Sequence, residues 1–303
     1  MNTDDQSLIY NRAEFRRGRT TMTADEKKKL ELFSAKMRRW VIEGVYNAKS
    51  GHPGGSLSCT DLICYLYNEA IKVDPSNPSD PERDRFVLSK GHCAPALYAA
   101  LGLRGFFDVN EIRNLRKIGS FLQGHPCKAI TPGIDMSTGS LGQGISTAVG
   151  MALAGKLDKK SYRVFSILGD GEMQEGEVWE ALMSAAHYKL DNICAFLDYN
   201  GLQIDGKVDD VMSLGDIEAK TKAFGWETVV IDGHDFDAIE GAVKAFEANQ
   251  GSGKPFFVIA KTHKGKGVSF MLDDPSWHGC APKEDQYNIA VEELDAKIAE
   301  LEG

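Results

Sequence analysis

The pattern of apolar and polar positions along the chain predicts an α/β protein. Short apolar runs recur at 85–89, 163–168, 193–198, 228–232 and 256–260. In the second half of the chain they alternate with helix-like stretches at 177–189, 214–224 and 236–248. Continuous apolar runs separated by helices are typical of strands buried on both faces. We therefore expect a parallel sheet flanked by helices, with right-handed crossovers.

The first half of the chain begins with a segment that lacks helical periodicity. Residues 1–22 are charged and polar, and we interpret them as a flexible N-terminal arm before a single domain at 23–303. Thr23 and Glu26 form a capping box, and Gly51 suits the C-terminal cap of the helix that follows. Two more helices are expected at 60–70 and 283–303. The segment "SGHPGGS" lies at the end of this first long helix.

Composition and charge narrow the class of protein. The chain has 303 residues, of which 42% are hydrophobic, so it can bury a sizeable core. Its formal net charge of −9 disfavours nucleic-acid binding. Neither a signal peptide nor an apolar run near the roughly 20 residues of a membrane span is present, so we expect no membrane partner. The six cysteines show no CxxC or zinc spacing, which predicts reduced thiols in a cytoplasmic protein.

Two polar side chains follow consecutive predicted strands. Asp170 lies between Gly169 and Gly171 after the run 163–168, and Asn200 follows the run 193–198. Carboxyl ends of neighbouring parallel strands meet at one edge of a sheet, where ligands bind. Carboxylate and amide oxygens suit Mg²⁺, which borrows further ligands from phosphates and water. Either fragment alone would be read as a turn or hairpin; together they predict a magnesium diphosphate site.

The motifs as a group resemble a known family. "GDGEMQEG" followed by "LDYNGLQIDG" resembles the thiamine diphosphate fingerprint, in a setting similar to the N-terminal half of transketolases. The likeness spans about residues 25 to 285. It includes "SGHPGGSLS", "SKGHCAPALYA", "GHP" with "STGSLGQG", "IDGHDFDAI", and "KGKG" with "WHGCAP".

The resemblance implies a cofactor and a metal with specific ligands. Asp170, Asn200 and the backbone carbonyl of Leu202 would hold Mg²⁺, or another divalent cation such as Ca²⁺ or Mn²⁺. The contacts to thiamine diphosphate would come from a set of glycines and a leucine, Gly139, Leu141, Gly142, Gly169 and Gly171. Tyr199 departs from the Asp or Asn common in the family at that position but leaves the asparagine in place.

The resemblance also assigns roles to loop histidines that stand beside Gly or Pro. His52 and His278 would contact the substrate and cofactor, His92 would lie against the diphosphate, and His125 would orient the donor. Imidazoles can donate or accept the protons that sugar hydroxyls exchange during ketol transfer. His187 fits an ordinary helix position, and His263 receives no role.

Three other side chains have alternative interpretations. Lys264 either orders the loop over the diphosphate, contacts it, or is simply solvated. Glu175 either joins a carboxylate network between two cofactor sites or stabilises the first turn of a helix. His234, with Asp232, is expected to shape a turn and cap the helix after it.

The resemblance further implies that this chain needs a second subunit. In transketolases the activating glutamate and the pyrimidine pocket belong to a downstream domain, and residues 201–303 are needed to complete the first sheet. We therefore expect a C-terminal transketolase subunit that carries the pyrimidine-binding domain, sugar phosphate substrates, and a heterotetramer. Ordinary, branched and sulfonated sugars all remain open.

Other functions remain as alternatives. The chain could belong to a decarboxylating 2-oxo-acid dehydrogenase or a deoxyxylulose-phosphate synthase-like enzyme, although "SGHPGG" and "WHGCAP" disfavour decarboxylation. It could also be a non-catalytic thiamine diphosphate-binding regulator, for which the loop histidines would be unnecessary.

Overall fold

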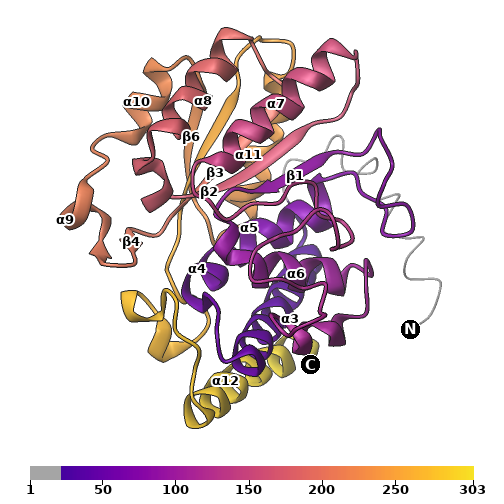
Figure 1. Ribbon diagram of the computed structural model, residues 1–303, viewed down its shortest axis with the longest axis vertical. Helices are drawn as coiled ribbons and strands as arrows, with labels where there is room; N and C mark the ends of the chain where they lie inside the picture. Colours follow the sequence, from indigo (N-terminus) through magenta and orange to yellow (C-terminus); the bar gives the residue numbers. More distant parts are fainter. Residues whose placement is uncertain (1–21) are drawn as a thin grey trace.

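A five-stranded parallel sheet forms the centre of the computed structural model, which describes residues 22–303 (Figure 1). The expected arm at 1–22 lies, except for its last residue, outside the described residues. The strands are β1 (Arg85–Leu88), β2 (Val164–Gly169), β3 (Ile193–Tyr199), β6 (Glu227–Asp232) and β7 (Phe256–Lys261). Their order in the sheet is β1-β2-β3-β7-β6 and every pair is parallel. The sequence-based prediction of a parallel sheet flanked by helices is confirmed.

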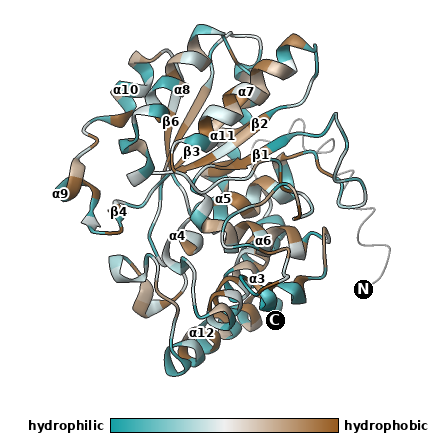
Figure 2. Ribbon diagram, viewed as in Figure 1, coloured by the Kyte–Doolittle hydropathy of each residue, from teal (hydrophilic) through white to brown (hydrophobic). Residues whose placement is uncertain are grey.

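Alternate residues of β1, β2, β3 and β7 enter two different cores. In β2, Phe165 and Ile167 pack into one cluster, while Val164 and Leu168 pack into the other. The first cluster includes α3 (Ala24–Ala48), α5 (Thr60–Tyr65), α6 (Ala94–Leu103) and α11 (Phe236–Asn249); the second includes α7 (Gln143–Leu157), α8 (Gly176–His187) and α10 (Ile217–Ala223). Figure 2 shows the resulting band of hydrophobic strands. Burial on both faces explains why these four strands are continuously apolar. The expectation is wrong for the run at 228–232, because β6 is an edge strand and leaves Val230 40% exposed.

Helix α3 begins where the sequence predicts and ends earlier. Thr23 Oγ1 accepts from the backbone of Glu26, and the glutamate carboxylate accepts from the backbone of Thr23, which completes the capping box. The prediction that Gly51 caps the helix is wrong. Lys49 adopts the left-handed conformation with φ 51°, and its N–H bonds to the carbonyl of Tyr46. The helix therefore ends just before the segment "SGHPGGS", which begins at Ser50.

The remaining elements surround this framework. The helix expected at 60–70 divides into α5 and a π-helical turn, η1 (Leu66–Ala70). The others are α4 (Pro53–Ser58), α9 (Val208–Met212), α12 (Glu284–Glu302), the β4–β5 hairpin (Leu202–Gln203 and Gly206–Lys207), and 3₁₀ turns η2 (Gly91–Cys93), η3 (Val109–Asn114), η4 (Gly171–Gln174), η5 (Ser269–Met271) and η6 (Pro275–Trp277). Helix α12 packs along α3, in the lower part of Figure 1. Among residues 22–303, no helix is both long and apolar enough to cross a membrane.

A buried ion pair closes the edge of the sheet at the amino ends of β1 and β2. Asp84, 1% exposed, accepts hydrogen bonds from the backbone N–H of Arg163 at 2.7 Å and from its guanidinium at 2.6 Å. The backbone N–H of Lys72 donates to the same carboxylate at 2.9 Å. The other side of the guanidinium meets Glu247, whose side chain is 51% exposed, at 2.9 Å. One arginine thus makes a buried and an exposed ion pair.

Substituting the two acidic partners separates their contributions. We expect Asp84→Ala to lower the free energy of unfolding by about 3–5 kcal/mol, because it leaves a buried guanidinium without its counter-charge. Glu247→Ala should lower it by less than about 1 kcal/mol, because water replaces the exposed carboxylate. Urea denaturation of both variants measures the difference. Equal losses would contradict this account of the edge.

Candidate functional site

A cavity of about 310 Å³ opens at the carboxyl ends of the strands. It is formed where the segments after β1, β2, β3 and β7 meet α4. Ten of the residues singled out from the sequence line it: His92, Leu141, Gly169, Asp170, Gly171, Glu175, Asn200, Leu202, Lys264 and His278. The remaining four, His52, His125, Gly139 and Gly142, lie behind or beside these residues. The topology thus brings the candidate residues together from distant parts of the sequence.

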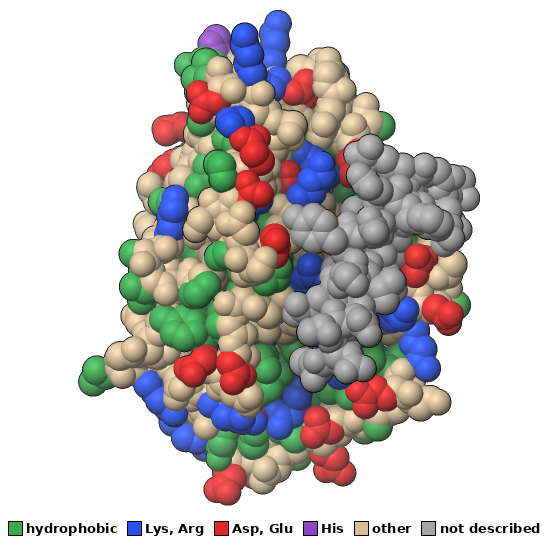
Figure 3. Space-filling model, turned by 90° about the vertical axis from the view of Figure 1, so that its right-hand side faces the viewer, with side chains coloured by type: hydrophobic (Ala, Val, Ile, Leu, Met, Phe, Trp, Pro, Cys, Tyr) green, Lys and Arg blue, Asp and Glu red, His purple; other side chains and the backbone are tan. Residues whose placement is uncertain are grey.

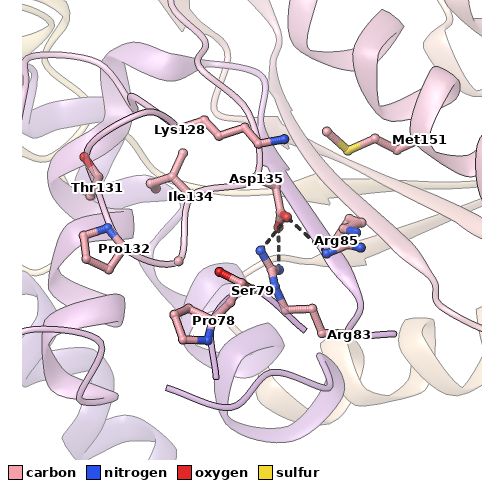
Figure 4. Close-up of a pocket in the computed structure, with 11 residues that line it drawn as sticks. Pro78, Ser79, Arg83, Arg85, Lys128, Thr131, Pro132, Ile134, Asp135 and Met151 are labelled. Carbon is pink, nitrogen blue, oxygen red and sulfur yellow. Dashed lines mark hydrogen bonds and ion pairs between the residues drawn. The ribbon is translucent and has the colours of Figure 1, made fainter. Parts of the chain in front are cut away.

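A larger hollow, of about 430 Å³, lies beside the edge strand β1 (Figure 4). Its two arginines, Arg83 and Arg85, point to Asp135, and Arg83 makes two hydrogen bonds to that carboxylate, at 2.7 and 2.9 Å. On the face of the molecule shown in Figure 3, acidic and basic side chains are interspersed. Asp135 pairs with both arginines, and none of the residues singled out from the sequence lines this hollow.

Asp170 is fixed by the turn that follows β2. Its side chain, 2% exposed, accepts from the backbone N–H of Gly171 at 2.8 Å and from that of Gly201 at 2.5 Å. Burial and the neighbouring carboxylate of Asp198 raise the pKa of Asp170 to about 6. A cation beside Asp170 would offset both effects. The site therefore has the electrostatic character of a cation-binding position.

Asn200 and Leu202 lie on the same wall of the cavity. Asn200 Oδ1 accepts from the backbone N–H of Leu202 at 3.1 Å, which fixes the turn after β3. The carbonyl oxygen of Leu202 accepts from Nζ of Lys264 at 3.2 Å. One carboxylate, one amide and one backbone carbonyl thus line a single cavity together with an ammonium group.

Lys264 is held at this wall and is almost completely buried, at 1% exposed. Burial and the nearby ammonium of Lys90 lower the pKa of Lys264 to about 8. Its Nζ is 2.9 Å from Nδ1 of His278. The interpretation of Lys264 as a solvated side chain is therefore wrong, because the loop after β7 folds back over the cavity. Glu175, in contrast, is exposed at the rim.

Four histidines gather beside the cavity. The ring centroids of His52 lie 5.2 Å from His92, 5.4 Å from His278 and 6.4 Å from His125, and those of His92 and His278 are 5.1 Å apart. Burial and neighbouring positive groups lower the pKa of His52 to about 4 and that of His278 to about 3. Both imidazoles are therefore neutral near pH 7 and can accept or donate through different nitrogens.

One histidine of the cluster has a ring nitrogen without a hydrogen-bond partner in the described part of the chain, and another packs closely against a glycine. Nδ1 of His52 is buried and has no hydrogen-bond partner among residues 22–303. Gly139, at φ 150°, packs so closely on His125 that a Cβ atom would lie 3.0 Å from the ring. His187 lies exposed at the end of α8, as the sequence predicts.

Asp198 and Lys90 form a buried ion pair that the sequence analysis missed. Asp198 is 0% exposed and Lys90 1%, and their charged atoms are in direct contact. The same carboxylate accepts from Ser58 Oγ at 2.6 Å and from Thr262 Oγ1. Lys90 Nζ also donates to the carbonyl of Gly55 at 3.1 Å. The available signal was an acidic residue within an apolar strand, since a buried carboxylate requires partners.

Glu172 was missed as well, although it stands in the fingerprint itself. Its carboxylate, 2% exposed, accepts from Ser89 Oγ at 2.5 Å and from the backbone N–H groups of Gly142 at 2.9 Å and Gly169 at 3.0 Å. Three segments of the cavity wall are thereby joined to one side chain. The left-handed φ of 86° at Gly142 allows its N–H to reach this carboxylate.

The interpretation of His234 is correct for the turn and wrong for the helix cap. Its N–H donates to Asp232 at 2.8 Å, but Asp235 caps α11. The ring instead joins the loop after β7 to the helices below it: Nδ1 is 2.7 Å from Asp61, and Nε2 accepts from the N–H of His263 at 2.9 Å. Asp61 also binds Arg38, whose Nε donates to the carbonyl of Lys266 at 2.9 Å. This network fixes both sides of Lys264.

Comparison with known proteins identifies the family. The domain described as "Transketolase, thiamine diphosphate binding domain" matches residues 31–298. The chain is 43% identical over 274 residues to one of the subunits of the apulose-4-phosphate transketolase of Phocaeicola vulgatus, covering 90% of this chain and 96% of the relative. It is 45% identical over 263 residues to the 6-deoxy-6-sulfo-D-fructose transketolase subunit SqwG of Clostridium sp., covering 87% and 95%.

Longer transketolases match over less than half of their length. The chain is 42% identical over 260 residues to transketolase of Homo sapiens, covering 85% of this chain and 40% of the human protein. The crystal structure of transketolase from Campylobacter jejuni superposes with a TM-score of 0.77 at 31% identity, over 90% of this chain and 48% of that one. The chain belongs to the transketolase family and consists largely of its thiamine diphosphate-binding domain.

Proposed function

We propose that this chain is the N-terminal subunit of a two-chain transketolase that uses Mg²⁺ and thiamine diphosphate. The enzyme transfers a two-carbon ketol unit from a ketose phosphate to an aldose phosphate. The observation that carries the proposal is the single wall on which a carboxylate, an amide and a backbone carbonyl stand beside a buried lysine. Such a wall offers oxygen ligands to a hard cation and an ammonium group to a diphosphate.

The residues of the cavity fit the cofactor and its metal. Asp170, Asn200 and the carbonyl of Leu202 would hold Mg²⁺, or Ca²⁺ or Mn²⁺ in its place. Lys264 and His92, which line the same cavity, would contact the diphosphate. Small residues keep the walls close to the ligand: a Cβ atom on Gly171 would stand 3.1 Å from Gln203. Gly139, Leu141, Gly142 and Gly169 would supply backbone contacts.

The histidine cluster supports proton transfer at the substrate. When bound, thiamine diphosphate supplies the nucleophilic carbon and the electron sink that cleavage of a ketose requires. His52, His125 and His278 would exchange protons with the sugar hydroxyls and the carbonyl oxygen. Their neutral state near pH 7 allows each ring to accept a proton from one oxygen and return it to another. His52 Nδ1, buried without a partner among the described residues, is the position best suited to a ligand.

A partner subunit is part of the proposal. The two relatives that this chain matches over nearly their whole length are named as subunits, whereas single-chain transketolases extend well beyond the match. We infer a C-terminal subunit that brings the pyrimidine-binding domain, and a heterotetramer of two chains of each kind. The six free cysteines favour the cytoplasm. Glu175, exposed at the rim, is placed to meet a second subunit.

The metal site can be tested through cofactor binding. Asp170→Asn keeps the shape of the side chain and removes the charge that attracts the cation. We expect the Mg²⁺-dependent affinity of the complex for thiamine diphosphate to fall by about 100-fold or more. Titration calorimetry measures the affinity, with Asp158→Asn, an exposed aspartate after α7, as the matched control. Unchanged affinity in Asp170→Asn would rule out the metal assignment.

The partner can be tested by reconstitution. Purified alone, the chain should show no ketol transfer, and addition of a copurifying subunit should restore it in an equimolar complex. Sedimentation of the mixture measures the stoichiometry, and product analysis identifies the reaction. Ketol transfer by the isolated chain would contradict the two-chain proposal, and release of carbon dioxide would instead favour a decarboxylating enzyme.

A further inference from the structure

Arg116 lies behind the histidine cluster in a strained loop between η3 and His125. Its backbone is left-handed, with φ 61°, and its N–H donates to the carbonyl of Leu122 at 2.9 Å. A non-glycine residue in this region carries a conformational cost. The turn directs the guanidinium onto Gly124, where a Cβ atom would stand 2.8 Å from its central carbon. The loop is therefore folded around this side chain.

The guanidinium joins the two loops that carry His52 and His125. One terminal nitrogen donates to Ser50 Oγ at 3.1 Å, two residues before His52. The other donates to the carbonyl of Gly124 at 3.4 Å, directly before His125. The two rings stand 6.4 Å apart. A single side chain thus joins segments that are far apart in the sequence.

Arg116 forms no ion pair with a carboxylate among the described residues. The three arginines that are buried among residues 22–303 each face a carboxylate, whereas Arg116 is half-buried: Arg38 pairs with Asp61, Arg83 with Asp135 and Arg163 with Asp84. Arg116 has no such ion pair among residues 22–303, and its Nε is buried without a hydrogen-bond partner there. A buried unsatisfied donor destabilises the fold. The arginine is therefore poorly explained as a stabilising residue.

The positive charge acts on both imidazoles. His125 is solvent-exposed overall, but partial desolvation of its ring lowers its pKa; Arg116 is the next cause, ahead of His92, while Cys93 opposes them. For His52, burial and His92 are followed by Arg116 and His125 in lowering the pKa to about 4, again against Cys93.

We propose that Arg116 is a positioning residue that braces the His52 and His125 loops against each other and places its positive charge beside both rings. The catalytic part of this inference rests on the proposed function. The two hydrogen bonds of Arg116 and its positive charge have different consequences, and two substitutions separate their effects. Arg116→Met removes both, whereas Arg116→Lys keeps the charge and loses the two-sided contact. Lys117→Met, at the exposed neighbour, is the matched control for a lost positive charge.

The first readout does not depend on activity. NMR titration of the imidazoles in the full chain should show a higher pKa for His125 and His52 in Arg116→Met, because a nearby positive charge has been removed. His187, exposed on α8, serves as an internal reference and should not change. Arg116→Lys and Lys117→Met should titrate like the native chain. An unchanged pKa of His125 in Arg116→Met would overturn the electrostatic part.

The second readout uses the reconstituted enzyme. Both Arg116 variants should lower kcat about tenfold or more with a smaller change in KM, because misplaced proton-transfer groups affect the reaction more than binding. In Arg116→Met the acidic limb of the pH profile should also move to higher pH. If both variants keep kcat within about twofold of the native enzyme, the positioning role is excluded. If the native complex itself transfers no ketol group, the proposed function fails, and the titration still decides whether Arg116 tunes the rings.

Discussion

The buried ion pair between Lys90 and Asp198 organises the cavity. Asp198 belongs to β3, Lys90 follows β1, and the hydroxyl groups on the same carboxylate come from α4 and from the segment after β7. Four segments that converge on the cavity therefore contact the same ion pair. A buried ion pair contributes little net stability, but loss of one partner is strongly destabilising. The pair specifies where the loops lie more than it stabilises the fold.

The charges around this pair support the proposal that the cavity binds a diphosphate together with a cation. Burial and Asp198 raise the pKa of Asp170, while burial and Lys90 lower the pKa of Lys264. Each of these pKa values is shifted because the group is buried and a like charge lies nearby. A metal ion beside Asp170 and an anion beside Lys264 would supply the missing counter-charges together. Under the proposed function, the cation and the diphosphate together would compensate both groups, whereas either alone would leave one of them uncompensated.

The sequence predicted the elements whose signal is local and missed those that depend on tertiary contacts. Strands β1, β2, β3 and β7 were evident because burial on both faces makes each a continuous apolar run, and Asp170 and Asn200 were evident because they follow such runs. Glu172 and Asp198 were missed because their importance lies in partners 30 to 140 positions away. Lys49 ended α3 early through a left-handed conformation that Gly51 was expected to provide. His234 could not be assigned correctly, because its neighbour Asp61 is 173 positions away.

The exposure of the site explains how half of an active site can exist in a separate chain. The groups proposed for the metal and diphosphate, Asp170 and Lys264, are buried within this chain alone, at 2% and 1% exposed. The groups proposed for the substrate are less covered, and His125 is exposed. At the cavity, Ile204 leaves 64% of its surface in water. Under the proposed function, this chain would enclose the charged end of the cofactor by itself and a partner would enclose the reacting end, so that loss of the partner should abolish ketol transfer before it abolishes recognition of the diphosphate.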